Sequence, residues 1–162
     1  MQTHGIQKYD AVINSPISGI GIRVRNQSIT AIDLLHKEVA LECFHSEYAE
    51  LVAQEIQQYF LNPKHVFAGE VCPSGTEYQQ SVWRLLQKIP SGKKLTYGQL
   101  ADQLASGPRA IGNACRNNPI PIIIPCHRVV AKNGLGGFAG KTTGFTVDVK
   151  RWLLAHESSA KN

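Results

Sequence analysis

The sequence lacks the features that mark membrane-spanning and cofactor-dependent proteins. Its longest apolar runs are far too short to cross a bilayer, and it contains no low-complexity tract. The N-terminus shows no basic region followed by a long apolar stretch, so we expect no signal peptide and a cytoplasmic location. No glycine-rich loop follows a predicted strand and opens a helix, which disfavours an enzyme that uses S-adenosylmethionine. We therefore expect no membrane contact and no cofactor.

The cysteines form no recognisable metal or disulfide pattern. The chain has four of them, Cys43, Cys72, Cys115 and Cys126, without any C-x-x-C pair. Structural zinc usually takes four convergent ligands from two closely spaced pairs. Disulfides are rare in the cytoplasm. We expect neither a metal site nor a disulfide.

Basic residues are scarce in the first half of the chain and abundant in the second. Residues 1–80 hold five Lys and Arg against nine Asp and Glu, a net charge of −4. Residues 81–162 hold twelve against three, a net charge of +9. A strongly basic half is typical of a protein that binds a polyanion such as DNA, although a solvated basic face gives the same count.

The first half predicts strands followed by one helix. Residues 9–15, 19–26 and 28–35 are short, rich in Val and Ile, and separated by turn-forming residues. Residues 46–60 carry apolar side chains at helical spacing, including Leu51, after the N-capping residue Ser46. Residues 62–75 show no periodicity and lie near the change of charge. We place a domain boundary there, with domains at 1–72 and 73–162.

The second half predicts four helices, within residues 75–92, 95–105, 109–119 and 147–157. The first two begin with capping boxes, Thr76 with Gln79 and Thr96 with Gln99. The second and third are separated by Ser-Gly-Pro, and the third is rich in small residues. This order is typical of a helix-turn-helix that binds DNA, although short helix pairs are common in proteins without that function.

The segment IPIIIPCHRV, residues 120–129, delivers one cysteine after a proline-bracketed apolar run. A thiolate is a strong nucleophile, and a neighbouring base can help to form it. In an extended segment His127 would point away from the Cys126 sulfur, so we expect a bridging water between them. Cys126 as a small buried apolar residue is the alternative.

This segment closely resembles the active-site signature of the O6-alkylguanine-DNA alkyltransferases, or methylated-DNA–protein-cysteine methyltransferases. Further stretches resemble the family's motifs in the same order: GTEYQQSVWRLLQKIPSGKKLTYGQLA, PRAIGNACRNNPIPIIIPCHRVV, GGFAG and KRWLLAHE. They cover most of residues 73–157. The resemblance implies an α/β N-terminal domain with a small antiparallel sheet, plus a mostly helical C-terminal winged helix-turn-helix domain.

The resemblance also implies a function. Such a protein flips O6-alkylguanine out of double-stranded DNA and transfers the alkyl group irreversibly to its cysteine, with O4-alkylthymine as a further substrate. We expect a monomer that is consumed in a single turnover. The resemblance implies three groups of site residues: catalytic Cys126, His127, Glu157 and Asn118; substrate-binding Tyr97, Val129, Phe138 and Gly140; and DNA-binding Arg109, Ala110, Gly112 and Arg116.

The roles that the resemblance implies are specific. His127 activates Cys126 through water, and Glu157 orients His127 and keeps it basic. Asn118 ties the helix-turn-helix to the active-site segment. Arg109 fills the space that the extruded base leaves.

In the pocket, the resemblance gives Tyr97 a contact to the target phosphate and a hydrogen bond to guanine N3. Val129 and Cys126 offer backbone carbonyls to the guanine amino group, and Phe138 lines the wall. The connection KTTGFTVD, residues 141–148, is longer than in many family members, which leaves the shape of the pocket lid open.

Two other functions remain possible from the sequence. A non-enzymatic DNA-binding protein that senses alkyl damage would leave Cys126 unreactive. A cysteine hydrolase would turn over an ester or amide. Accessibility of the thiol and repeated turnover distinguish these from alkyl transfer.

Overall fold

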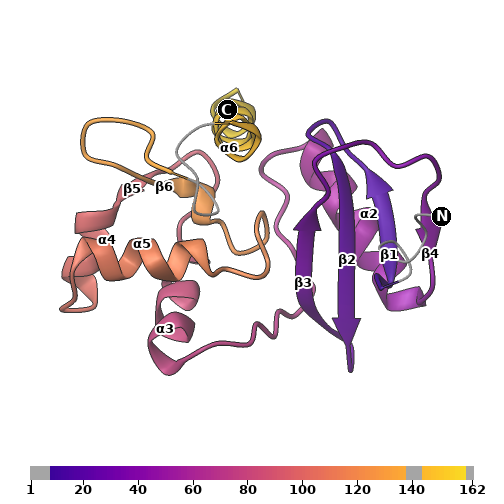
Figure 1. Ribbon diagram of the computed structural model, residues 1–162, viewed down its shortest axis with the longest axis horizontal. Coiled ribbons are helices and arrows are strands. Elements are labelled where there is room, and N and C mark those ends of the chain that lie inside the picture. Colours follow the sequence, from indigo (N-terminus) through magenta and orange to yellow (C-terminus); the bar gives the residue numbers. More distant parts are fainter. Residues whose placement is uncertain (1–7, 138–143, 160–162) are drawn as a thin grey trace. The chain divides into compact units, whose positions relative to one another are not determined.

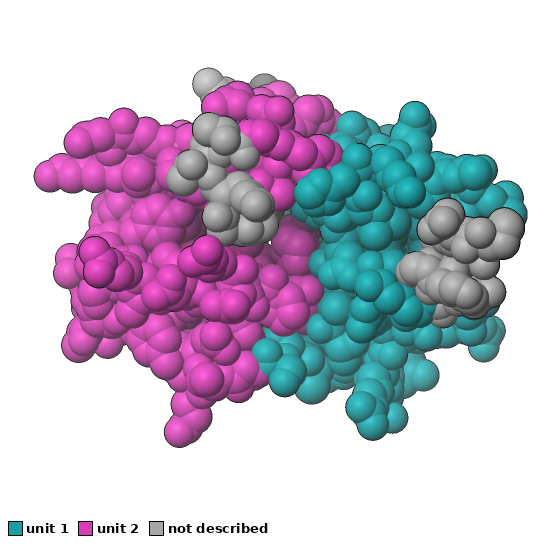
Figure 2. All heavy atoms as spheres, viewed as in Figure 1, with its two compact units in different colours: residues 1–74 teal, residues 75–162 magenta. Residues whose placement is uncertain are grey.

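The computed structural model describes residues 8–137 and 144–159, and the chain divides into two compact units, residues 1–74 and 75–162 (Figure 2). The boundary that we predict between residues 72 and 73 falls two residues before this division. That each unit is an independent domain stays a prediction. The units are described one at a time below.

The first unit contains the predicted antiparallel sheet (Figure 1). Its strands are β1 (Ala11–Asn14), β2 (Gly19–Arg25), β3 (Ser28–Leu34) and β4 (Cys43–Phe44), in the order β3-β2-β1-β4. Each neighbouring pair is antiparallel. Asn26 and Gln27 both have positive φ, as the tight turn between β2 and β3 requires. The sequence signals predicted β1 to β3, but not the two-residue strand β4.

Helix α2 (Glu47–Leu61) packs against β1 and β2. Ser46 caps it as predicted, because its side chain accepts a hydrogen bond from the Ala49 backbone N–H. The buried face carries Val52, Ala53, Ile56 and Tyr59 together with Ala49. The prediction that Leu51 lies on that face is wrong. Its side chain is 57% exposed, because the buried residues lie one position further along the helix.

Residues 62–74 have no periodicity, yet they are held to α2 and to the sheet. The Glu55 carboxylate accepts hydrogen bonds from the Ala68 and Gly69 backbone N–H groups at 2.7 and 3.1 Å. Its Oε1 also lies 3.1 Å from His65 Nε2. Backbone hydrogen bonds then join Ile29 to Glu70 and Cys72. Tertiary contacts therefore order a segment that the sequence pattern leaves irregular.

The second unit begins with α3 (Glu77–Leu86) and α4 (Tyr97–Gln103), and both predicted capping boxes are formed. In α3 the buried residues include Val82, Trp83 and Leu86. Trp83 Nε1 donates to the Ala114 carbonyl oxygen at 2.9 Å, which ties α3 to α5 (Pro108–Arg116). Pro108 occupies the first turn of α5, where its missing N–H costs nothing.

Helices α4 and α5 pack against each other across a short turn, as a helix-turn-helix requires. Next to them, β5 (Leu95–Thr96) pairs in parallel with β6 (Val129–Val130). In the described part of this unit, the other strand pairing is the isolated bridge between Ala131 and Gly134. The prediction of a mostly helical C-terminal unit is confirmed, and the wing of the predicted winged helix-turn-helix stays a prediction.

The last helix, α6 (Phe145–Ser158), begins two residues earlier than the predicted range. Residues 145–148, which we counted as part of a long connection, are therefore helical. Residues 141–143 of that connection lie outside the described residues, and its length relative to other family members stays a prediction. Val147, Val149, Lys150, Leu153 and Glu157 are buried on this helix.

Candidate active site

The segment that carries Cys126 is built from tight turns and clamped by one asparagine. Asn118 Nδ2 donates to the Ile124 carbonyl oxygen at 2.8 Å, and Asn118 Oδ1 accepts from the Ile120 N–H at 2.9 Å. The Asn118 side chain thus supplies the hydrogen bonds that a helix or a sheet would otherwise give to these two backbone groups. The Cys126 N–H bonds back to the Ile124 carbonyl oxygen across Pro125. Asn118 therefore fixes the backbone two residues before the thiol.

Ile122 holds an unusual backbone conformation in this segment. Its φ is +75°, and the Ile123 N–H donates to the Pro121 carbonyl oxygen, so Ile122 is the centre of a γ-turn. A β-branched residue at positive φ is strained. Its side chain is 1% exposed, so burial and the flanking prolines hold the turn in place. Such strain is typical of segments that position a functional group.

Glycine and alanine substitutions separate strain from packing at Ile122. Ile122→Ala removes apolar packing but keeps the Cβ atom that makes positive φ unfavourable. We expect Ile122→Gly to be at least as stable as Ile122→Ala, with a gain of up to about 1 kcal/mol, because glycine adopts this φ without strain. The matched pair at Ile120, which is fully buried without positive φ, should show the usual order, with glycine less stable. Urea unfolding measures all four variants, and the same order at both positions would contradict the strain.

Cys126 lies in a short 3-10 turn, η1 (Cys126–Arg128), and not in the extended segment that we expected. The difference follows from Pro125 and the tight turns before it. The thiol is buried, and burial raises the pKa of Cys126 to about 11, while a hydrogen bond from Asn118 and the charge of Lys150 lower it. At neutral pH the resting group is therefore a thiol. Its activation needs a base close by.

His127 is fully buried next to such a thiol and has one ring nitrogen free. Its Nε2 lies 2.7 Å from Glu157 Oε2. A carboxylate only accepts, so Nε2 carries the hydrogen and Nδ1 has a lone pair. Nδ1 is buried without a hydrogen-bond partner among the described residues. The tautomer that Glu157 selects therefore leaves Nδ1 able to take a proton.

The charge state of this pair differs in part from our expectation. Glu157 is buried, yet hydrogen bonds from His127 and Arg128 outweigh burial and hold its pKa well below the usual range. Burial lowers the pKa of His127, and the contribution of Glu157, which raises it, does not reverse the direction. Glu157 thus orients His127, but the imidazole is less basic than a histidine in water.

Two buried cations, Arg128 and Lys150, lie at the site outside the predicted set of site residues, and the sequence motifs pointed only to Arg128 as a possible support. Arg128 donates to Glu157 through Nε and Nη2 at 2.9 and 2.8 Å. Lys150 is fully buried and donates from Nζ to the carbonyl oxygens of Val129 and Gly137, at 2.6 and 2.8 Å. Burial lowers the pKa of Lys150 to about 8. Lys150 lies on the same face of α6 as Val147 and Glu157. A charged residue at a core position of the helical pattern could have pointed to Lys150 in the sequence.

Tyr97 lies close to Lys150 and to Gly112 of α5. Burial, followed by the charges of Cys115 and Cys126, raises the pKa of Tyr97 to about 12, so its hydroxyl keeps its proton. Its ring centroid is 5.9 Å from Lys150 Nζ, and a Cβ on Gly112 would lie 4.0 Å from the Tyr97 ring. Tyr97, Lys150 and the start of η1 thus belong to one cluster.

The remaining predicted site residues divide into three groups. Val129 is buried in β6, with its carbonyl oxygen already bonded to Lys150. On α5, Arg109 and Arg116 are exposed, while Ala110 and Gly112 are partly buried. Phe138 and Gly140 lie outside the described residues.

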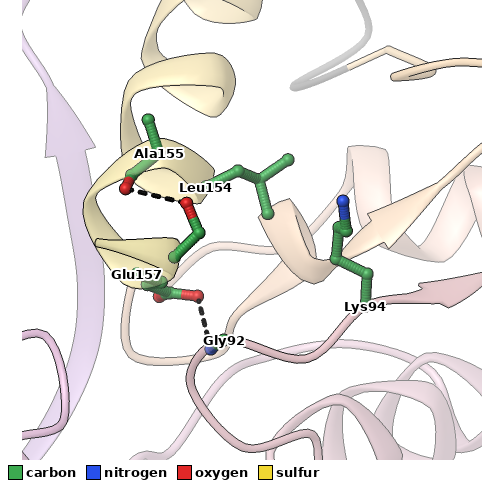
Figure 3. Close-up of a pocket in the computed structure, with 6 residues that line it drawn as sticks. Gly92, Lys94, Leu154, Ala155 and Glu157 are labelled. Carbon is green, nitrogen blue, oxygen red and sulfur yellow. Dashed lines mark hydrogen bonds between the residues drawn. The ribbon is translucent and has the colours of Figure 1, made fainter. Parts of the chain in front are cut away.

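A cavity lies beside the carboxylate of Glu157. It is lined by Gly92, Lys94, Leu154, Ala155, Glu157 and Ser158. Figure 3 shows the Glu157 side chain turned towards Gly92, whose N–H lies 3.5 Å from Oε1. This weak contact adds to the hydrogen bonds that His127 and Arg128 make to the carboxylate.

The described residues contain no cluster of three or more His, Cys, Asp or Glu side chains that could hold a metal ion. Among the same residues, no helix is long and apolar enough to span a membrane. The site is therefore built from the thiol, the imidazole–carboxylate pair and the two buried cations. These groups lie in the same unit as the paired helices α4 and α5.

Comparison with known proteins gives the family. The model of the 6-O-methylguanine DNA methyltransferase DNA-binding domain matches residues 77–159. The chain is 33% identical to a methylated-DNA–protein-cysteine methyltransferase of Methanosarcina acetivorans, over 93% of this chain and 99% of that protein. It is 32% identical to the constitutive methylated-DNA–protein-cysteine methyltransferase of Bacillus subtilis, over 90% and 93%.

Comparison with a solved structure supports the same family. Mycobacterium tuberculosis OGT in complex with DNA aligns with a TM-score of 0.77 and 32% identity, over 92% of each chain. This chain belongs to the methylated-DNA–protein-cysteine methyltransferase family, which confirms the resemblance of the sequence motifs.

Proposed function

We propose that this protein repairs DNA by moving the alkyl group of O6-alkylguanine onto Cys126. The observation that carries the proposal is the buried thiol beside an imidazole whose free Nδ1 can take its proton. Family membership supplies the substrate class, since the relatives are named for methylated DNA. The basic second half of the chain suits a DNA partner.

The chemistry is a single displacement. The thiol proton passes through water to His127 Nδ1, and the sulfur then forms a bond to the alkyl carbon. The bond from that carbon to guanine O6 breaks, and its electron pair stays on guanine, which takes up a proton. The thioether product offers no acyl or phosphoryl centre for water to attack, so each chain acts once. Rigid placement of the sulfur by Asn118 and the γ-turn aligns the attack.

The other site residues act on an extruded base. Arg109, exposed near the start of α5, fills the space left in the duplex. The neutral Tyr97 hydroxyl donates a hydrogen bond to guanine N3. The Val129 carbonyl oxygen keeps one lone pair for the guanine amino group, because Lys150 uses the other. Phe138 and Gly140 complete the pocket, and Ala110, Gly112 and Arg116 contact the DNA.

The finer points of the proposal are a monomeric protein, action on O4-alkylthymine as well, and two independently folding domains. The second candidate function is a DNA-binding protein that senses alkyl damage without repairing it. The unpaired Nδ1 of His127, the residue that follows Cys126 in the chain, favours alkyl transfer over this alternative.

The test is stoichiometric labelling. DNA that carries radiolabelled O6-methylguanine should transfer its label to the protein, up to one methyl group per chain, with peptide mapping to Cys126. Multiple turnovers would indicate a different enzyme. DNA binding without any label on the protein would favour the damage sensor.

Substitution of Arg109 tests base extrusion. Because extrusion costs a few kcal/mol in paired DNA and less in single strands, Arg109→Ala should slow transfer strongly in duplex DNA and much less in single-stranded oligonucleotides. Single-turnover rates on matched, mismatched and single-stranded substrates measure the effect.

The exposed Arg116 on the same helix is the matched control. As an ordinary phosphate contact, Arg116→Ala should weaken binding to all substrates and reduce the salt dependence by about one unit of slope. The same behaviour in Arg109→Ala would contradict its role in extrusion.

A further inference from the structure

The carboxylate of Glu157 is shared between two partners that compete for its charge. His127 Nε2 and Arg128 Nη2 both contact Oε2, at 2.7 and 2.8 Å, while Arg128 Nε contacts Oε1 at 2.9 Å. The Glu157 side chain is 1% exposed, so solvent screens these contacts very little. The electrostatic effect of Glu157 on His127 is therefore determined by the groups in this cluster.

A buried carboxylate paired with histidine alone would favour the imidazolium. The doubly protonated ring carries a hydrogen on Nδ1 as well as on Nε2, and it then has no lone pair for another proton. Such a pair would orient His127 correctly but would block it as the acceptor for the Cys126 proton. Orientation by Glu157 therefore requires something that offsets its charge.

Arg128 is held where it can provide that offset. Its guanidinium grips both carboxylate oxygens, and Nη1 donates to the Ile89 carbonyl oxygen at 2.5 Å. An arginine stays charged at all relevant pH values, and its planar fork suits this two-point contact. The contact to Ile89 fixes the guanidinium from the side away from Glu157.

We propose that Arg128 is a positioning residue that neutralises Glu157, so that Glu157 selects the tautomer of His127 without charging the ring. His127 then stays uncharged at neutral pH, with Nδ1 free to accept. The role rests on the proposed function, because the proton in question is that of Cys126. The charged groups that act on His127 are Glu157 and Lys150 from α6, and Arg128 from its own turn.

The electrostatic directions agree with this geometry. Burial lowers the pKa of His127 most, Glu157 raises it, and the charges of Arg128 and then Lys150 lower it. Without Arg128, the contribution of Glu157 would be opposed by burial and by Lys150 alone. The pKa of His127 should then rise towards neutral pH or beyond.

The titration of His127, followed by NMR of its ring in the whole protein, tests the proposal. In the wild type, the midpoint should lie below the ordinary value of about 6.5. In Arg128→Met it should rise by at least about one unit, whereas Arg128→Lys, which keeps a cation, should shift it less. Arg151→Met is the matched control, since Arg151 is 65% exposed on α6 in a pair with Asp148. It should leave the midpoint unchanged.

The pH profile of single-turnover methyl transfer gives the functional readout. In Arg128→Met the rate should fall about tenfold per pH unit below the new midpoint and approach the wild-type rate at high pH. An equal loss at every pH would show that Arg128 merely packs. A wild-type midpoint above about pH 7 overturns the proposal even if Arg128→Met does not fold. Absence of transfer in the wild type would contradict the proposed function, while the NMR titration would still test Arg128.

Discussion

In Cys126→Ser protein we expect no methyl transfer at all, while binding to DNA persists. Serine is close in size to cysteine, so the tight turns around residue 126 and the Asn118 clamp should survive. A hydroxyl is a far weaker nucleophile than a thiol near neutral pH, and His127 is less basic than an exposed histidine. Labelled O6-methylguanine DNA, followed by a denaturing gel, measures the transfer.

Cys72→Ser is the matched control for this experiment. Cys72 is an exposed free cysteine in the first unit, and its substitution should leave transfer intact. Label on Cys43, Cys72 or Cys115 of the Cys126→Ser protein would contradict the assignment of the nucleophile.

In His127→Ala protein we expect a loss that depends on pH. General-base assistance is typically worth about 10²–10⁴-fold, so transfer at neutral pH should fall by that order. Without the base, the rate follows the thiolate fraction of Cys126, whose pKa burial raises to about 11. The rate of the variant should therefore rise about tenfold per pH unit between about pH 7 and pH 9.5. The wild-type rate should stay nearly flat, because its His127 is already neutral.

Single-turnover rates across this pH range measure both slopes. His65→Ala serves as the control, since His65 pairs with Glu55 in the first unit. If the loss in His127→Ala were equal at both ends of the pH range, His127 would have a packing role and no role as a base.

The sequence predicted several local features correctly, because each depends on residues close together in the chain. Ser46, Thr76 and Thr96 cap their helices as predicted, since a cap joins a side chain to a backbone N–H three residues away. The strands of the sheet followed in the same way from short apolar runs between turns. The motif around Cys126 likewise predicted the family.

Some features were mispredicted because the deciding contacts are not local. The turn at Cys126 departs from an extended strand because Asn118 and the buried isoleucines hold the segment before it. Leu51 fits the helical period but lies outside the stripe that the sheet covers. Periodicity gives the spacing of a buried face but fixes its angle only roughly.

By itself, the sequence determined the family, the helix caps, the clamp residue Asn118 and the nucleophile Cys126 as a prediction. Only the tertiary structure decided the electrostatics of the site. Glu157 reaches His127 and Arg128 across about thirty residues of chain, and Lys150 enters the same core from α6. Whether an imidazole is charged depends on burial and on every nearby charge, and both arise when distant segments pack together. The family motif identifies the site residues, and the packing around Glu157 determines their protonation states.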